Sequence, residues 1–101
     1  MKELIIDSIT YFEPKKTMTY DEAMEWASTR GLRLLTRGEW CDLFDYKKEF
    51  RNSCQPDFYW TATLDFTNPN YACFFSGKFG FICSGSRDYS YTVRAVKADM
   101  K

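Results

Sequence analysis

Residues Gly31–Trp40, with the sequence GLRLLTRGEW, decide the fold. Gly31 can adopt the left-handed conformation that ends a helix, because it has no Cβ atom. The apolar run Leu32–Leu35 then predicts a short buried strand. Thr36 and Glu39 have the spacing of a capping box, in which the hydroxyl and the carboxylate each accept a backbone N–H at a helix start. These ten residues therefore end one helix, cross the core and begin another.

The segments on either side of this stretch continue the pattern. Thr19 and Glu22 form a second capping box, which predicts a first helix over Tyr20–Arg30. A second helix is expected over Arg37–Lys48. Near the N-terminus, β-prone segments flank Asp7-Ser8 and predict a strand or a strand pair.

The second half of the chain has a strand-like period. Residues Phe50–Asp57 are expected to be a polar connection. The expected strands are Phe58–Thr63, Tyr71–Phe75, Phe79–Cys83 and Tyr91–Val96, with a hairpin turn around Ser76-Gly77-Lys78. This order predicts an α+β fold in one domain, residues 1–101, with two helices followed by a small twisted antiparallel sheet.

Composition excludes several classes of function. Fourteen basic and fourteen acidic side chains cancel, which argues against general binding to a nucleic-acid backbone. The chain has no histidine, the commonest general base and zinc ligand, and its four cysteines lack a C-x-x-C pair. We therefore expect no catalytic residue, metal or cofactor, and four buried thiols. No signal peptide or membrane-spanning run is evident, so a cytoplasmic protein of a bacterial host cell is expected.

Several short motifs occur in the order and spacing of a C-type-lectin-like domain. They are the helix Tyr20–Arg30, Gly31–Thr36 with Glu39, the strand Tyr59–Thr63, the turn Ser76-Gly77, and Val93–Val96. Within that fold the chain resembles the bacterial and phage domain family of unknown function found at the C-terminus of the Lcl collagen-like adhesin. The resemblance covers residues 17–97 and departs from the family at Leu35, where that family usually has proline. It implies a C-type-lectin-like fold and a binding role rather than a reaction.

Two polar loops, Leu64–Asn70 and Ser84–Ser90, carry the candidate binding residues. We expect them to emerge on one side of the sheet, where this fold class displays its ligand-contacting loops. Tyrosine, asparagine and arginine are enriched in contact surfaces. The predicted partner-binding residues are Asp65, Phe66, Asn68, Asn70, Arg87, Asp88 and Tyr89. An alternative stays open, in which Phe66 and Tyr89 only cover the end of the core.

The expected function is that of a non-enzymatic protein-binding module, encoded by a phage or a mobile element. It would occupy a surface of a host protein, as an inhibitor of a defence or regulatory factor. The alternative is a structural or receptor-binding component of a phage particle. The first should form a defined complex with one host protein, whereas the second should self-assemble or appear in virions.

Overall fold

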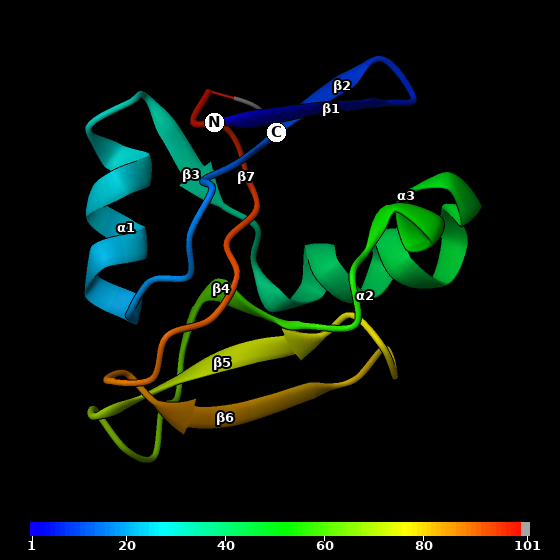
Figure 1. The fold of residues 1–101 in the computed structure, drawn as a ribbon. Coiled ribbons are helices and arrows are strands. Elements are labelled where there is room, and N and C mark those ends of the chain that lie inside the picture. The colour runs from blue at the N-terminus through cyan, green and yellow to red at the C-terminus, as the bar shows by residue number, and fades with distance from the viewer. Residues whose placement is uncertain (100–101) are drawn as a thin grey trace.

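Two antiparallel sheets with helices between them make up residues 1–99, the part of the chain that the computed structural model describes (Figure 1). One sheet has four strands in the order β1-β2-β7-β3, and the other has three in the order β4-β5-β6. The strands are β1 (Lys2–Ile6), β2 (Ile9–Glu13), β3 (Leu32–Leu34), β4 (Phe58–Leu64), β5 (Tyr71–Ser76), β6 (Ile82–Ser86) and β7 (Ala95–Lys97). The helices are α1 (Tyr20–Ser28), α2 (Arg37–Tyr46) and α3 (Lys48–Ser53). The domain is thus α+β.

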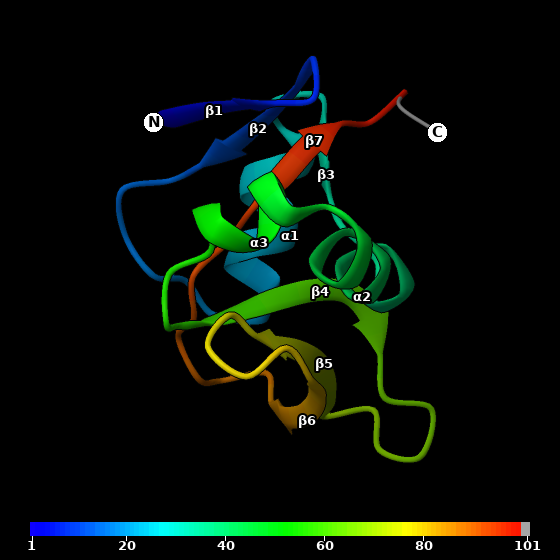
Figure 2. The same ribbon diagram turned by 90° about the vertical axis from the view of Figure 1, so that its right-hand side faces the viewer.

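The layout corrects the expected arrangement of two helices followed by one sheet. The β1–β2 hairpin pairs with the last strand through Phe12 and Ala95, and β7 also pairs with β3. The two ends of the chain therefore share a sheet, while β4, β5 and β6 form a separate one. Figure 2 shows α2 and α3 between these two sheets.

The local signals of the first half act as the sequence predicts. Both α1 and α2 begin with complete capping boxes, at Thr19 with Glu22 and at Thr36 with Glu39. Gly31 has φ of +69°, which ends the turn after α1 and aims the chain into β3. Asp7-Ser8 forms the two-residue turn between β1 and β2, and both of its residues have positive φ, as this kind of tight hairpin turn requires.

The expected second helix and polar connection are wrong beyond Tyr46. The chain breaks at Lys47, whose ψ of +97° is extended, and then forms α3. Phe50, placed by the sequence in a polar linker, is fully buried against Trp40 and Tyr11, with ring centroids 5.3 Å away in each case. A six-residue helix is too short for its periodicity to be recognised in the sequence. The burial of its one aromatic ring, Phe50, instead determines where α3 lies.

The hairpin between β5 and β6 is longer than expected. Phe75 pairs with Ile82, so the predicted strand Phe79–Cys83 starts too early and the predicted loop Ser84–Ser90 includes the end of β6. Gly80 has φ of +74°, and a Cβ there would lie 2.5 Å from the Phe44 ring. A tertiary contact with α2 therefore fixes the turn, which the two-residue pattern around Ser76 does not reveal.

The core has two parts, one on each face of the three-stranded sheet. Neighbouring residues of a strand point to opposite faces. Trp60 accordingly joins a cluster with α1 and β3, whereas Tyr59 joins a cluster with Trp40 and Phe50. The second cluster also surrounds the guanidinium of Arg94, a fully buried residue.

Candidate binding surface

The two loops singled out from the sequence meet at their bases. The Arg87 N–H donates to the Asn70 carbonyl at 3.0 Å, and the Arg87 guanidinium donates to the Pro69 carbonyl at 3.1 Å. The Ser84 hydroxyl donates to Asp65 at 2.6 Å. The structure therefore brings the loop after β4 and the turn after β6 to the same end of the sheet.

Several of the predicted binding residues hold these loops in shape. Asp65 accepts hydrogen bonds from the N–H and the hydroxyl of Thr67, at 2.8 and 2.7 Å. The Asn68 side chain accepts from the Asn70 N–H at 3.0 Å. Arg87 pairs with Asp21 of α1 and lies over the Tyr20 ring, 5.2 Å from its centroid. Bonds within the protein therefore already position these three side chains.

Asp65 gives the loop a pH dependence. Hydrogen bonds from the Ser84 hydroxyl, and then from Thr67, lower the pKa of Asp65 from 3.8 to about 2. The unfolded chain therefore binds more protons between these values, so the contribution of Asp65 is complete above pH 4 and falls as the pH approaches 2. Carboxyl-carbon NMR should find this titration midpoint. Ser84→Ala should raise it and Ser90→Ala should not; a wild-type midpoint near 3.8 would contradict the assignment.

The other predicted residues differ in their surroundings. Phe66 is 94% exposed at the loop tip and has no aromatic contact within residues 1–99. Asn70 and Asp88 are exposed. Tyr89, 59% exposed, instead lies 6.1 Å from the Tyr91 ring, measured between centroids. Phe66 therefore does not cover the core, whereas Tyr89 is one end of a larger aromatic surface.

This surface, which the sequence did not reveal, is the part of the Trp60 face of the three-stranded sheet that α1 and β3 leave uncovered. The register places Phe58, Ser76 and Phe81 in one row across the sheet, and Trp60, Phe74 and Cys83 in the next. Tyr91, from the segment before β7, lies over them. We use the term aromatic face for the residues of this group that reach the surface: Phe58, Phe81, Cys83, Tyr89 and Tyr91.

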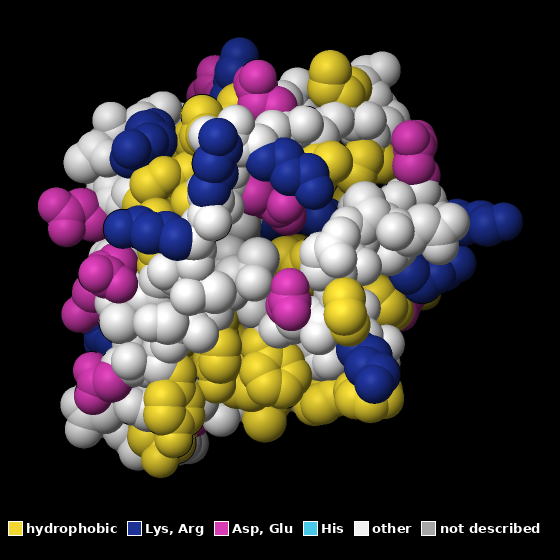
Figure 3. Space-filling model, viewed as in Figure 1, with side chains coloured by type: hydrophobic (Ala, Val, Ile, Leu, Met, Phe, Trp, Pro, Cys, Tyr) yellow, Lys and Arg dark blue, Asp and Glu magenta, His cyan; other side chains and the backbone are white. Residues whose placement is uncertain are grey.

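Two rings of the aromatic face, Phe58 and Tyr91, are fixed by contacts with each other and with the core. Phe58 packs on Phe74 at 4.7 Å and on Tyr91 at 5.4 Å between ring centroids. Tyr91 in turn packs on the buried Trp60 at 4.6 Å. Phe58 and Phe81 are nonetheless 42% and 46% exposed. Figure 3 shows hydrophobic side chains gathered over β5 and β6.

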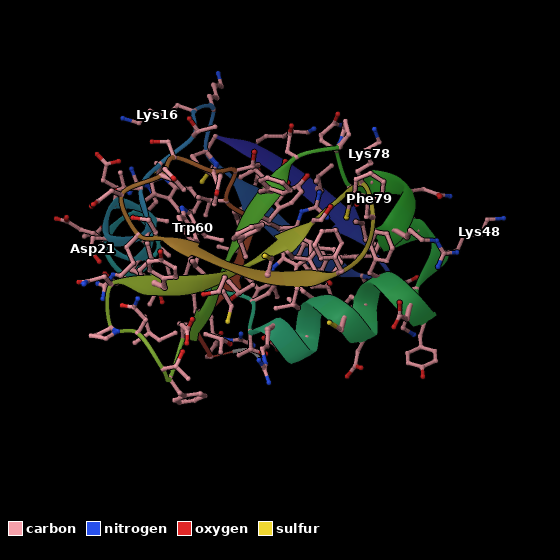
Figure 4. The ribbon with its side chains drawn as sticks, turned by 90° about the horizontal axis from the view of Figure 1, so that it is seen from below. Lys16, Asp21, Lys48, Trp60, Lys78 and Phe79 are labelled. Atoms are coloured by element: carbon pink, nitrogen blue, oxygen red, sulfur yellow. The ribbon has the colours of Figure 1, made fainter. Side chains whose placement is uncertain are left out.

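The tip of the β5–β6 hairpin extends this surface. Phe79 is 68% exposed, its ring lies 6.1 Å from that of Phe81, and the Lys78 ammonium lies 5.2 Å above it. Figure 4 shows Lys78 and Phe79 at one end of the hairpin and Asp21 at the opposite end of the view. The face is therefore flanked by a cation at one end and by the Arg87–Asp21 pair at the other.

The alternation Phe58–Trp60 is the sequence signal that could have indicated this face. Aromatic residues also occur on the opposite face, at Tyr59 and Phe75, so alternation alone does not say which face is open. The structure decides, because α2 and α3 cover the face of Tyr59 and Phe75, whereas α1 and β3 cover the other face at Trp60 and leave Phe58 exposed. The same geometry makes the expectation of four buried thiols wrong: all four cysteines are unpaired, and Cys83 is exposed.

Within residues 1–99, no group of three or more histidine, cysteine, aspartate or glutamate side chains could hold a metal ion. In the same range, no helix has the length and apolar character to cross a membrane. No protein-family model matches the chain, and no curated protein matches it significantly.

Proposed function

We propose that this protein is a non-enzymatic C-type-lectin-like module that binds another protein through the aromatic face. The observation that carries this function is the row of rings from Tyr89 through Tyr91 to Phe58, held in place yet exposed. Contiguous apolar surface of this kind is typical of interaction sites, and tyrosine and phenylalanine bury a large area with few rotatable bonds. The lectin-like assignment rests on the order of the motifs from Tyr20 to Val96.

The proposed partner is a host protein in a bacterial cell that carries a phage or a mobile element. Occupying a functional surface of a defence or regulatory factor requires no catalytic group. It does require a rigid contact surface, because ordering side chains on binding weakens the affinity. The Phe58 and Tyr91 rings of the aromatic face are already ordered by Phe74 and Trp60.

Affinity purification from host lysate tests the proposal, with stoichiometry measured by size exclusion and light scattering. One host protein should be retained in a defined ratio. Tyr89→Ala and Phe58→Ala should weaken the complex by about thirtyfold each, as expected for central interface rings. Tyr46→Ala is the matched control, because Tyr46 is 80% exposed on α2, which packs against the other face of the sheet.

Two outcomes would contradict this assignment. Binding that survives both aromatic-face changes but is lost in Phe66→Ala would move the site to the tip of the loop after β4. A chain that retains no host protein and instead assembles with virions would favour a structural component of a phage particle. Thermal melts of each variant exclude loss of folding as the cause.

A further inference from the structure

The outer edge of β6 is open. β6 is the last strand of the order β4-β5-β6, and no helix or strand among residues 1–99 lies beyond it (Figure 1). The Ser76 N–H donates to the Phe81 carbonyl at one end of β6, and the Arg87 N–H donates to the Asn70 carbonyl at the other end. The odd-numbered residues of β6 therefore form the backbone hydrogen bonds to β5. In an antiparallel pair the intervening residues direct their N–H and C=O groups outward. Ile82, Ser84 and Ser86 therefore direct backbone groups toward the outer edge, where the Ser86 carbonyl already accepts a hydrogen bond from the Tyr89 N–H at 3.2 Å.

This edge lacks the features that normally prevent strand pairing. Natural edge strands are blocked by charges, proline or bulges. β1, an edge of the other sheet, carries Lys2 and Glu3. β6 has the sequence ICSGS, with no charge and no proline, and its pairing with β5 is regular over five residues. An extended strand could therefore be added here without a steric or electrostatic barrier from β6 itself.

We infer that the added strand is β6 of a second copy, giving a dimer with a continuous antiparallel sheet. A two-fold axis at Ser84 pairs Ser84 with its equivalent and Ile82 with Ser86, so each outward N–H faces a carbonyl, and the Ser86 carbonyl accepts a second hydrogen bond beside that from Tyr89. On the aromatic side, Phe81 then lies beside Arg87 of the second copy, and Cys83 lies beside Gly85, which has no side chain.

Charge favours the pairing at the two ends of the paired strands and opposes it at the axis, where each Ser84 holds an Asp65 carboxylate at 2.6 Å. The hairpin tip of one copy lies beside the turn after β6 of the other, which brings the cation Lys78 toward the anion Asp88. The chain has equal numbers of acidic and basic side chains, so two copies have no net repulsion. The axis is perpendicular to the sheet, so both aromatic faces lie on one side. This inference does not depend on the proposed function, which Tyr89→Ala tests separately.

Sedimentation from micromolar to millimolar concentration, under reducing conditions, tests the dimer. Wild-type protein should shift from 12.0 kDa toward twice that mass. Ser84→Pro removes only an outward N–H, and proline is tolerated at such edge positions. It should weaken association about a hundredfold, because both copies lose a hydrogen bond and leave a carbonyl without a donor. Ser84→Ala, which keeps the N–H, should still dimerise.

A second variant tests the same interface in case Ser84→Pro does not fold. Cys83→Lys leaves the backbone donors intact and places one ammonium group from each copy on either side of the axis, so like-charge repulsion should weaken the dimer at low salt while the circular-dichroism spectrum stays that of the wild type. A wild-type protein that stays monomeric throughout would overturn the inference. So would a dimer that persists in both Ser84→Pro and Cys83→Lys, because its interface would lie elsewhere.

Discussion

Replacing Arg94 by alanine should lower the free energy of unfolding by about 3–5 kcal/mol. Arg94 is fully buried, and its Nε donates to the buried Glu13 carboxylate at 2.8 Å. Its remaining nitrogens donate to the hydroxyl and the carbonyl of Ser53, at 3.0 and 3.2 Å. Removing the guanidinium leaves a carboxylate without its cation in the core, and this unpaired charge causes most of the loss.

Four aromatic rings enclose the same guanidinium. The centroid of Phe50 lies 4.9 Å from its central carbon, and those of Tyr59, Trp40 and Tyr11 lie 5.5 to 5.9 Å away. Arg94 thereby connects the end of β2, α3 and the segment before β7. Its substitution should release α3 first, since six residues have little helical stability of their own.

Urea denaturation provides the measurement and a matched control. The double change Arg94→Met with Glu13→Leu removes both charges and fills the space with apolar atoms, so it should recover most of the lost stability. Equal stability losses in Arg94→Met and in the double variant would show that packing, rather than the unpaired carboxylate, is responsible. An Arg94→Ala protein as stable as wild type would contradict the burial of the pair.

Replacing Trp60 by alanine should also lower the free energy of unfolding by about 3–5 kcal/mol. The indole is fully buried, and its N–H donates to the Met18 carbonyl at 2.9 Å. It packs edge-on against Tyr20 at 5.4 Å and lies beneath Tyr91. The cavity would lie between α1 and the three-stranded sheet, directly below the aromatic face.

Trp60→Phe separates packing from the hydrogen bond. This variant keeps a ring in the site and loses the N–H, so we expect a loss of about 1–2 kcal/mol. Chemical denaturation of both variants checks the ranking. A Trp60→Ala protein that keeps its stability but no longer binds a partner would instead place Trp60 in the contact surface.

A structural feature could be predicted from the sequence where the signal for it lies within a few consecutive residues. The starts of α1 and α2 follow from Thr19 and Thr36, because a capping box involves four consecutive residues. The turn at Asp7-Ser8 and the positive φ at Gly31 are equally local. The two candidate loops could be named from composition, but which of their side chains are already bonded could not.

The sequence by itself determined the helix starts, the short strand after Gly31 and the α+β class, because those depend on hydrogen bonds and periodicity within a few residues. Only the tertiary structure decided that α3 exists, that β6 begins at Ile82, and that Arg94 lies in the core. Each of these features depends on a contact between residues distant in the chain. Phe50 of α3 packs on Tyr11, Gly80 before β6 lies against Phe44, and Arg94 pairs with Glu13. It also decided which part of the sheet is open, since α2 and α3 cover the Tyr59 face and α1 and β3 cover only part of the Trp60 face.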